Sequence, residues 1–279
     1  MLEWAITHRR KNRRDHYLPQ SYLKGFIDPL RQNLPRPVWH FDIATQKWSE
    51  RSPREFGYRY GFYDYSGDPA SIKSADETFA SLEQTFPRVR AQLIADNFEN
   101  WTDFRDFLLC YLQMMRARSL SFMAEMRKTG ENLRGLVIKE VLPYGKSVKV
   151  DSLTPTRLPA NFITNWTIGQ MTEEIDKGEG WANEFNWALR YADSVEDPFV
   201  VGDGPVVFST PSSTVADGWH NPESLLFFPL CWQACLIGSR KFFEIETSRF
   251  AKEDMHTIRQ IYRDTTEIFL VSPQRLDHF

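Results

Sequence analysis

Two polar side chains that could take part in chemistry stand four residues apart in a short, largely apolar segment early in the sequence. Residues 16–26 read H-Y-L-P-Q-S-Y-L-K-G-F, which places His16 first and Gln20 fifth. Histidine titrates near neutral pH, so His16 is a candidate catalytic acid or base, or a phosphate ligand. In a helix Gln20 would lie on the same face and could bind a substrate amide or phosphate. The alternative is that His16 caps an element or satisfies a buried carbonyl group.

Two further polar residues interrupt the most apolar helical pattern of the chain. Gln113 and Arg116 occur in Y-L-Q-M-M-R. A buried amide or guanidinium group without a partner is costly, so each requires a carboxylate, a carbonyl or an anionic ligand. We predict that both bind an anion; the alternative is a structural ion pair, for example Arg116 with Asp203 or Glu83. Arg118 points toward the same apolar stripe and raises the same question.

An acidic residue occupies a tight turn between two apolar β-like segments. Asp203 lies in G-D-G-P at 202–205, between F-V-V and V-V-F. A carboxylate at the end of a buried strand is a common position for a catalytic or metal-binding group. We predict that Asp203 is catalytic and either orients His16 or holds a metal; no residue is assigned as a metal ligand from spacing. The alternative is that Asp simply suits a turn.

Charge and composition restrict the partners that the chain can have. Residues 9–14 carry five positive charges, and they either contact phosphates or form a solvated, mobile lead-in. The whole chain has a net charge of −3, which as a bulk value indicates no nucleic-acid or membrane partner. Three Cys without a C-x-x-C pair, and no apolar stretch of membrane-spanning length, predict a cytoplasmic protein without a disulfide framework.

Apolar periodicity predicts the elements that must position these residues. A short helical pattern follows Pro19, and a second one covers 75–95 despite Pro87. The strongest helical pattern covers 103–122, where Thr102 would be the N-cap. Residues 37–65 are β-rich, with a hairpin followed by an aromatic stretch over the core. Further helices are predicted at 130–142, 170–177 and 251–268, a loop at 154–159, and strands in F-V-V, V-V-F, L-L-F-F-P-L, A-C-L-I-G and I-F-L-V.

These elements predict an α+β fold in one domain. Central buried helices would combine with an N-terminal hairpin and a small, mainly antiparallel C-terminal sheet. The 279 residues are within the range of a single domain, 1–279, in which residues 1–15 form the basic lead-in.

The order of the motifs resembles the family catalogued as "domain of unknown function 4238". The opening H-Y-L-P-Q-S-Y-L-K-G-F is similar to that family's H-Y-V-P-Q-x-Y-L-x-x-F. F-Y at 62–63, the acidic 77–83 segment, Q-M-M-R at 113–116, and G-D-G-P followed by F-P-L at 228–230 resemble later motifs in the same order. Gly202 and Gly204 replace the Ser and Asn of the family's S-D-N-P. The resemblance implies membership but no activity.

Two hypotheses for function remain open at this point. In the first, the protein is a hydrolase, a nuclease-like enzyme or a binding protein for an anionic, phosphate-containing ligand such as RNA, DNA or a nucleotide, in a bacterial defence or toxin setting. His16 and Asp203 would be catalytic, with Gln20, Gln113 and Arg116 binding the ligand. In the second, it is a non-catalytic interaction protein whose buried polar residues are structural. No common nucleotide, dehydrogenase or serine-hydrolase motif occurs, and no cofactor or oligomeric state is predicted.

Overall fold

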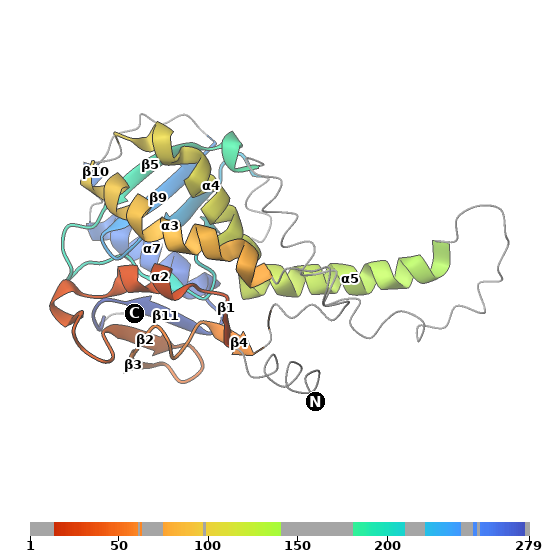
Figure 1. Cartoon of the computed structure of the whole chain (residues 1–279), viewed down its shortest axis with the longest axis horizontal. Helices are drawn as coiled ribbons and strands as arrows, with labels where there is room; N and C mark the ends of the chain where they lie inside the picture. The colour runs from red at the N-terminus through yellow and green to blue at the C-terminus, as the bar shows by residue number, and fades with distance from the viewer. Residues whose placement is uncertain are drawn as a thin grey trace.

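The helices and sheets of the chain form an α+β fold, seen in a computed structural model (Figure 1). The structure describes residues 14–60, 62, 75–96, 99–140, 181–209, 221–240, 248–249 and 252–276. The helices are α2 (Gln20–Leu23), α3 (Ala75–Ala95), α4 (Trp101–Ala117), α5 (Leu120–Glu140) and α7 (Lys252–Thr265), with short 3₁₀ helices η1 (Lys24–Phe26), η2 (Pro29–Arg31) and η5 (Trp181–Glu184). The predicted helix 170–177 and loop 154–159 lie outside the described residues.

The strands are distributed over three sheets. They are β1 (Arg14–His16), β2 (Val38–Asp42), β3 (Lys47–Arg51), β4 (Tyr58–Tyr60), β5 (Asn186–Tyr191), β6 (Val201–Gly202), β7 (Val207–Ser209), β8 (Leu225–Pro229), β9 (Ala234–Ser239), β10 (Ser248–Arg249) and β11 (Phe269–Ser272). One sheet has the order β10-β5-β9-β8-β7, a second β3-β2-β11-β6, and a third is the two-stranded β1-β4 ribbon. Apart from the parallel β10–β5 pair, the strand pairings among the described residues are antiparallel.

The predicted N-terminal hairpin forms, but it is not a separate unit. The side chain of Asp42 accepts hydrogen bonds from the backbone and hydroxyl of Thr45, which fixes the turn between β2 and β3. Strand β11 pairs with β2 on one side and with β6 on the other. The hairpin therefore shares one sheet with strands from the C-terminal half, a long-range pairing that local periodicity does not contain.

The two β runs on either side of G-D-G-P are confirmed, but they belong to different sheets. Strand β6 ends at Gly202 in the four-stranded sheet, and β7 begins at Val207 in the five-stranded sheet. Helix α7 fixes the connection between β6 and β7, because the hydroxyl of Tyr262 donates to the backbone carbonyls of Pro205 and Phe227 at 2.8 and 3.1 Å. The G-D-G-P turn thus joins two sheets rather than two arms of one hairpin.

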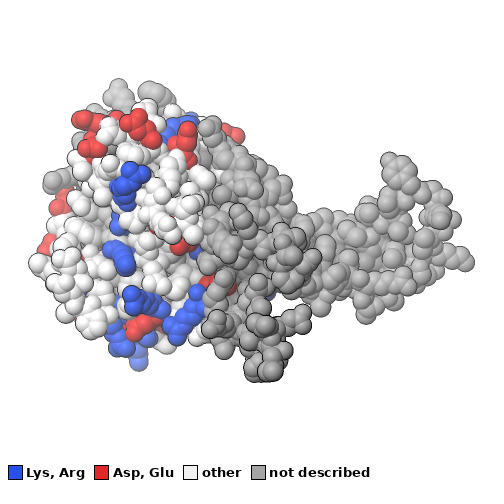
Figure 2. Space-filling model, in the orientation of Figure 1, with Lys and Arg blue, Asp and Glu red and all other residues white. Residues whose placement is uncertain are grey.

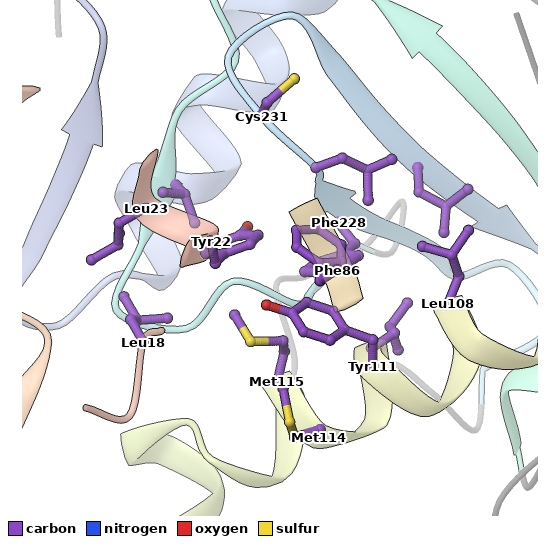
Figure 3. Packing of buried hydrophobic residues seen from close by; sticks show 14 of the residues in the cluster. Leu18, Tyr22, Leu23, Phe86, Leu108, Tyr111, Met114, Met115, Phe228 and Cys231 are labelled. Carbon is purple, nitrogen blue, oxygen red and sulfur yellow. The ribbon is translucent and has the colours of Figure 1, made fainter. Parts of the chain in front are cut away.

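A cluster of stacked aromatic rings joins the helices to the five-stranded sheet (Figure 3). The rings of Phe86 and Tyr111 are parallel, with centroids 3.9 Å apart, and Tyr22 stacks on Phe228 at 5.7 Å. The Tyr22 hydroxyl donates to the carbonyl of Pro229 at 2.6 Å, so this buried polar group is satisfied. The cluster connects α2, α3 and α4 to β8 and confirms that the predicted central helices are buried.

Pro87 lies inside α3 without ending it. The predicted apolar face is confirmed around it, since Phe79, Phe86 and Val89 are buried while Leu82 is partly buried. A proline removes one backbone donor and usually kinks a helix, but burial of these neighbouring side chains opposes its disruption.

The prediction of one helix over 103–122 is wrong, because the chain leaves the helix at Arg118 and Ser119 and re-enters it as α5. The Ser119 hydroxyl oxygen accepts from the backbone N–H of Phe122 at 3.2 Å, which is an N-cap for the new helix. The Thr102 cap is also wrong: α4 begins at Trp101, two residues before the predicted start, and its N-cap Asn100 makes no capping hydrogen bond with its side chain. Leu108, Tyr111 and Met115 are fully buried as predicted, whereas Phe104 is only partly buried.

Candidate functional site

His16 lies on the two-stranded β1–β4 ribbon, which periodicity did not predict. Arg14 pairs with Tyr60 and His16 pairs with Tyr58 across the ribbon. Since side chains alternate along a strand, these four residues share one face, and Asp15 between them is buried on the other. The strands of this ribbon have three residues each, too few for a period of two to be recognised in the sequence.

His16 and Gln20, both predicted from the sequence, are in direct contact. Their Nε2 atoms are 3.3 Å apart, and both side chains are partly buried. The Gln20 amide donates to Nε2 of His16 when the imidazole is in the tautomer that carries its proton on Nδ1. Gln20 therefore fixes the ring, and a substrate that used Nε2 of His16 would have to displace the amide.

A cationic and aromatic surface surrounds this pair. The guanidinium of Arg14 lies 4.7 Å from the centroid of the Tyr58 ring, and its Nε donates to the Tyr60 hydroxyl at 3.3 Å. That hydrogen bond stabilises the phenolate and lowers the pKa of Tyr60. Tyr60 is 56% exposed, contrary to the prediction that the aromatic stretch covers the core. Phe62 of the same stretch does pack against the core.

The buried arginine of the α4 pattern is Arg118. Its side chain has no exposed surface, and it donates to the carboxylate of Glu83 and to the backbone carbonyl of His16. The guanidinium also lies 4.9 Å from the centroid of the Phe79 ring. The structural ion pair that the sequence suggested for Arg116 with Glu83 is therefore made by Arg118, and it ties the end of α4 to α3 and β1.

Gln113 is buried in α4, but unlike Arg118 its side chain is not fully satisfied by hydrogen bonds to the described residues. The residue is 3% exposed, and its Oε1 atom has no hydrogen-bond partner among the described residues. We predicted that this amide requires a partner, and the acceptor is not satisfied by the parts of the chain that the structure describes. An unsatisfied buried acceptor costs about 1–3 kcal/mol.

Arg116 lies on the other side of the α4–α5 junction, in a cavity of about 420 Å³. Arg116 lies near the G-D-G-P turn, because Gly204 of that turn and Val206 just after it line the same cavity. Its guanidinium is 5.2 Å from the centroid of the Phe122 ring. The carboxylates of Glu125, Asp264 and Glu267 also line the cavity, so the electrostatic surroundings of Arg116 are mainly negative.

Asp203 is buried behind this cavity and contacts backbone. Its Oδ1 accepts from the N–H of Glu267 at 3.2 Å, which joins the G-D-G-P turn to the connection between α7 and β11. Burial disfavours the charged form and raises the pKa of Asp203 from 3.8 to about 6. This geometry gives Asp203 a structural contact, whereas its predicted action on His16 stays a prediction.

The two glycines of the turn have different surroundings. A Cβ atom on Gly202 would collide with the Oγ1 of Thr266, so the Thr266 side chain fills the space in which a serine would stand. A Cβ on Gly204 would meet nothing within 4 Å, because Gly204 faces the open cavity. The glycine at 202 is thus explained by Thr266; nothing in the structure explains the glycine at 204.

Two of the predicted residues, His16 and Gln20, are linked to the α4–α5 junction by contacts, whereas no contact links Gln113 or Asp203 to them among the described residues. Gln20 contacts His16, and the backbone carbonyl of His16 accepts a hydrogen bond from Arg118. Arg116, two residues before Arg118, lines the cavity together with Gly204. The sequence placed Arg14 in the basic segment 9–14 and the rings of Tyr58 and Tyr60 over the core, but it did not predict that they pair on one ribbon face.

Metal and membrane features can be assessed for the described part of the chain. Within it, no group of three or more His, Cys, Asp or Glu side chains could hold a metal ion. No helix there is both long and apolar enough to cross a lipid bilayer.

The family assignment rests on a match that covers most of the chain. The model of the family described as "Protein of unknown function (DUF4238)" matches residues 14–266, from the start of β1 to just beyond the end of α7. No curated protein and no solved structure shows significant similarity to the chain. The matched range includes the ribbon, the α4–α5 junction and the G-D-G-P turn, and on this match the chain belongs to the DUF4238 family of proteins of unknown function.

Proposed function

We propose that this protein binds single-stranded RNA or DNA across the exposed face of the β1–β4 ribbon. The observation that carries the proposal is the pairing of an exposed aromatic ring, Tyr60, with a guanidinium group, Arg14, on one small sheet face. Bases stack on exposed aromatic rings without strict sequence preference, and arginine neutralises the adjacent phosphates.

The local charge supports an anionic ligand at this face. Arg14 is the last of the five basic residues at 9–14. Arg59 on β4 is also exposed, but it pairs with Asp15 and therefore lies on the other face of the ribbon. Asp15, the acidic residue of β1, is buried. Figure 2 shows that among the coloured residues Lys and Arg predominate at the end of the molecule that carries β1–β4 and β2–β3, while Asp and Glu gather at the opposite end. A net charge of −3 therefore coexists with a basic end.

His16 gives the same face a group that can transfer a proton. It lies 5.5 Å from Tyr58, ring centroid to ring centroid, so a nucleotide stacked here would place a phosphate close to the imidazole. The nuclease-like extension of the proposal assigns His16 as the acid–base group and Gln20 as the residue that orients it. Cleavage requires the substrate to replace the Gln20 amide at Nε2.

The test is binding of fluorescein-labelled oligo-U and oligo-dT, followed by fluorescence anisotropy at several salt concentrations. We expect Tyr60→Ala to weaken binding by about 1–3 kcal/mol through lost stacking, and Tyr60→Phe to retain most of it. Arg14→Gln should reduce the salt dependence by about one phosphate contact. Arg88→Gln, an exposed arginine on α3, is the control. Equal affinities for all four variants would refute the proposal.

The non-catalytic interaction protein is the second candidate, and a specific observation favours it. Arg118 and Asp203, two of the buried charged groups, bind backbone atoms that hold elements together. Under this reading the buried polar residues stabilise the fold and take no part in chemistry. A wild-type protein that binds no oligonucleotide at low salt would favour this candidate.

A further inference from the structure

The cavity at the α4–α5 junction has a charge opposite to that of the ribbon. Its ionisable lining consists of the carboxylates of Glu125, Asp264 and Glu267 and the guanidinium of Arg116, which together carry a formal charge of −2. The three acidic residues are exposed, so they are accessible to a ligand entering from solvent. A polyanion is disfavoured here, whereas a ligand with two positive charges is electrostatically matched.

Helix α7 adds to the negative potential of the cavity. Asp264 and Thr265 are its last residues, and the C-terminal carbonyl groups of a helix carry partial negative charge. The Thr265 hydroxyl donates to the carbonyl of Ile261 at 2.8 Å, and the Asp264 carboxylate accepts from the Gln260 amide at 2.8 Å. These hydrogen bonds hold the polar rim in place.

The cavity wall is partly apolar, which restricts the kind of cation that fits. Phe122, Val206 and Phe208 line it beside the carboxylates. A bare divalent ion would need several oxygen ligands around one point, and no such cluster of three acidic or His side chains occurs in the described residues. Carboxylates on α5, on α7 and after α7 that share one cavity with apolar side chains instead match a chain of methylene groups with a charge at each end.

We propose that this cavity binds a linear aliphatic diamine or polyamine. One ammonium group pairs with the carboxylates at the end of α7, Asp264 and Glu267, and the other pairs with Glu125 on α5. The methylene chain lies along Phe208 and Val206. A volume of about 420 Å³ is sufficient for such a ligand, since small-molecule sites range from about 300 to 1,000 Å³. This site is separate from the ribbon and does not depend on the nucleic-acid proposal.

The experiment is isothermal titration of the nucleic-acid-free protein with 1,4-diaminobutane and spermidine, compared with butylamine and MgCl₂. We expect the diamine and spermidine to bind, and butylamine to bind about tenfold or more weakly because one charged pair is lost. Glu267→Gln and Glu125→Gln should each weaken diamine binding by about tenfold. Glu223→Gln, an exposed acid in the turn before β8, is the matched control.

Three results would overturn the proposal. They are the absence of heat with either polyamine, equal affinity for Mg²⁺ and the diamine, or an equal loss in the Glu223→Gln control. The two lining residues are exposed, so these variants should remain folded, which circular dichroism verifies. The Tyr60→Ala variant should bind the diamine like the wild type, and this separates failure at the cavity from failure at the ribbon.

Discussion

The two sides of the α4–α5 junction use the same side chain in opposite ways. Arg118 is fully buried and is bound by one carboxylate and one backbone carbonyl, whereas Arg116, two residues earlier, is partly exposed in a cavity with three carboxylates. Residues two positions apart along a helix point in directions about 200° apart, so the two guanidinium groups face different neighbours. The comparison shows that residue type and local spacing do not identify which arginine is structural.

The largest expected effect is on the buried side of this junction. Arg118→Met leaves Glu83 and the His16 carbonyl without their donor, and should reduce the free energy of unfolding by about 3–5 kcal/mol. Arg116→Met should cost about 1 kcal/mol or less, the size of a partly exposed cation–π contact. Urea unfolding of both variants measures the difference. Equal losses would show that the two arginines are not distinct in role.

A core truncation on α4 gives the next largest effect. Leu108 is fully buried in the helical cluster, and Leu108→Ala should lower the free energy of unfolding by about 2–5 kcal/mol. Leu30→Ala is the control, because Leu30 is 91% exposed and should change stability by no more than about 0.5 kcal/mol. Thermal unfolding compares the two, and an unchanged midpoint for Leu108→Ala would contradict the placement of this helix in the core.

The third prediction concerns Asp203 behind the cavity. Its folded-state pKa of about 6 lies above the unfolded value of 3.8, so folding favours the protonated form. The associated stability is fully present below about pH 4 and is lost as the pH rises through about 6. Relative to Asp203→Asn, which does not titrate, the wild type should lose at most about 3 kcal/mol between pH 4 and pH 8.

Urea unfolding of wild type and Asp203→Asn at several pH values tests this dependence. The difference between the two proteins removes the contribution of other titrating groups. A difference that stayed constant from pH 4 to pH 8 would mean that the Asp203 carboxyl is not perturbed by burial.

The smallest of these effects comes from the glycine at the end of β6. Gly202→Ala introduces a methyl group into the space of the Thr266 side chain and should cost about 1–3 kcal/mol. In the double variant Gly202→Ala, Thr266→Ala the collision is relieved, so the combined loss should be smaller than the sum of the two single losses. Additive losses would show that the two positions are not coupled.

Local patterns predicted much of the fold, because most helices and strands bury a periodic face. The helix around Phe79 and Phe86, the β2–β3 hairpin and the strands of the C-terminal half all follow from such faces. Local patterns do not predict which strands pair, since the pairing of β11 with β2 joins residues more than two hundred positions apart. The end of α4 was missed because apolar residues continue past Arg118, and the Ser119 cap lies within that pattern.

The candidate site was predictable only where its residues are close in sequence. His16 and Gln20 are in contact, but they do not lie on one helix face as their spacing of four suggested, because His16 is in β1 and α2 begins at Gln20. Arg116 and Arg118 could not be distinguished, because α4 is apolar on nearly every side. The ribbon surface was missed, since Arg14 and Tyr60 come together only through a pairing across 46 residues.

The position of β11 has a consequence for synthesis of the chain on the ribosome. Strand β11 lies between β2 and β6, so β2 has only β3 as a neighbour until residues 269–272 have left the exit tunnel. During that interval the hairpin presents an unpaired backbone edge over residues 39–42, and such edges are prone to pair with other chains. A nascent chain stalled before residue 269 should therefore bind holdase chaperones more strongly than one released after residue 276.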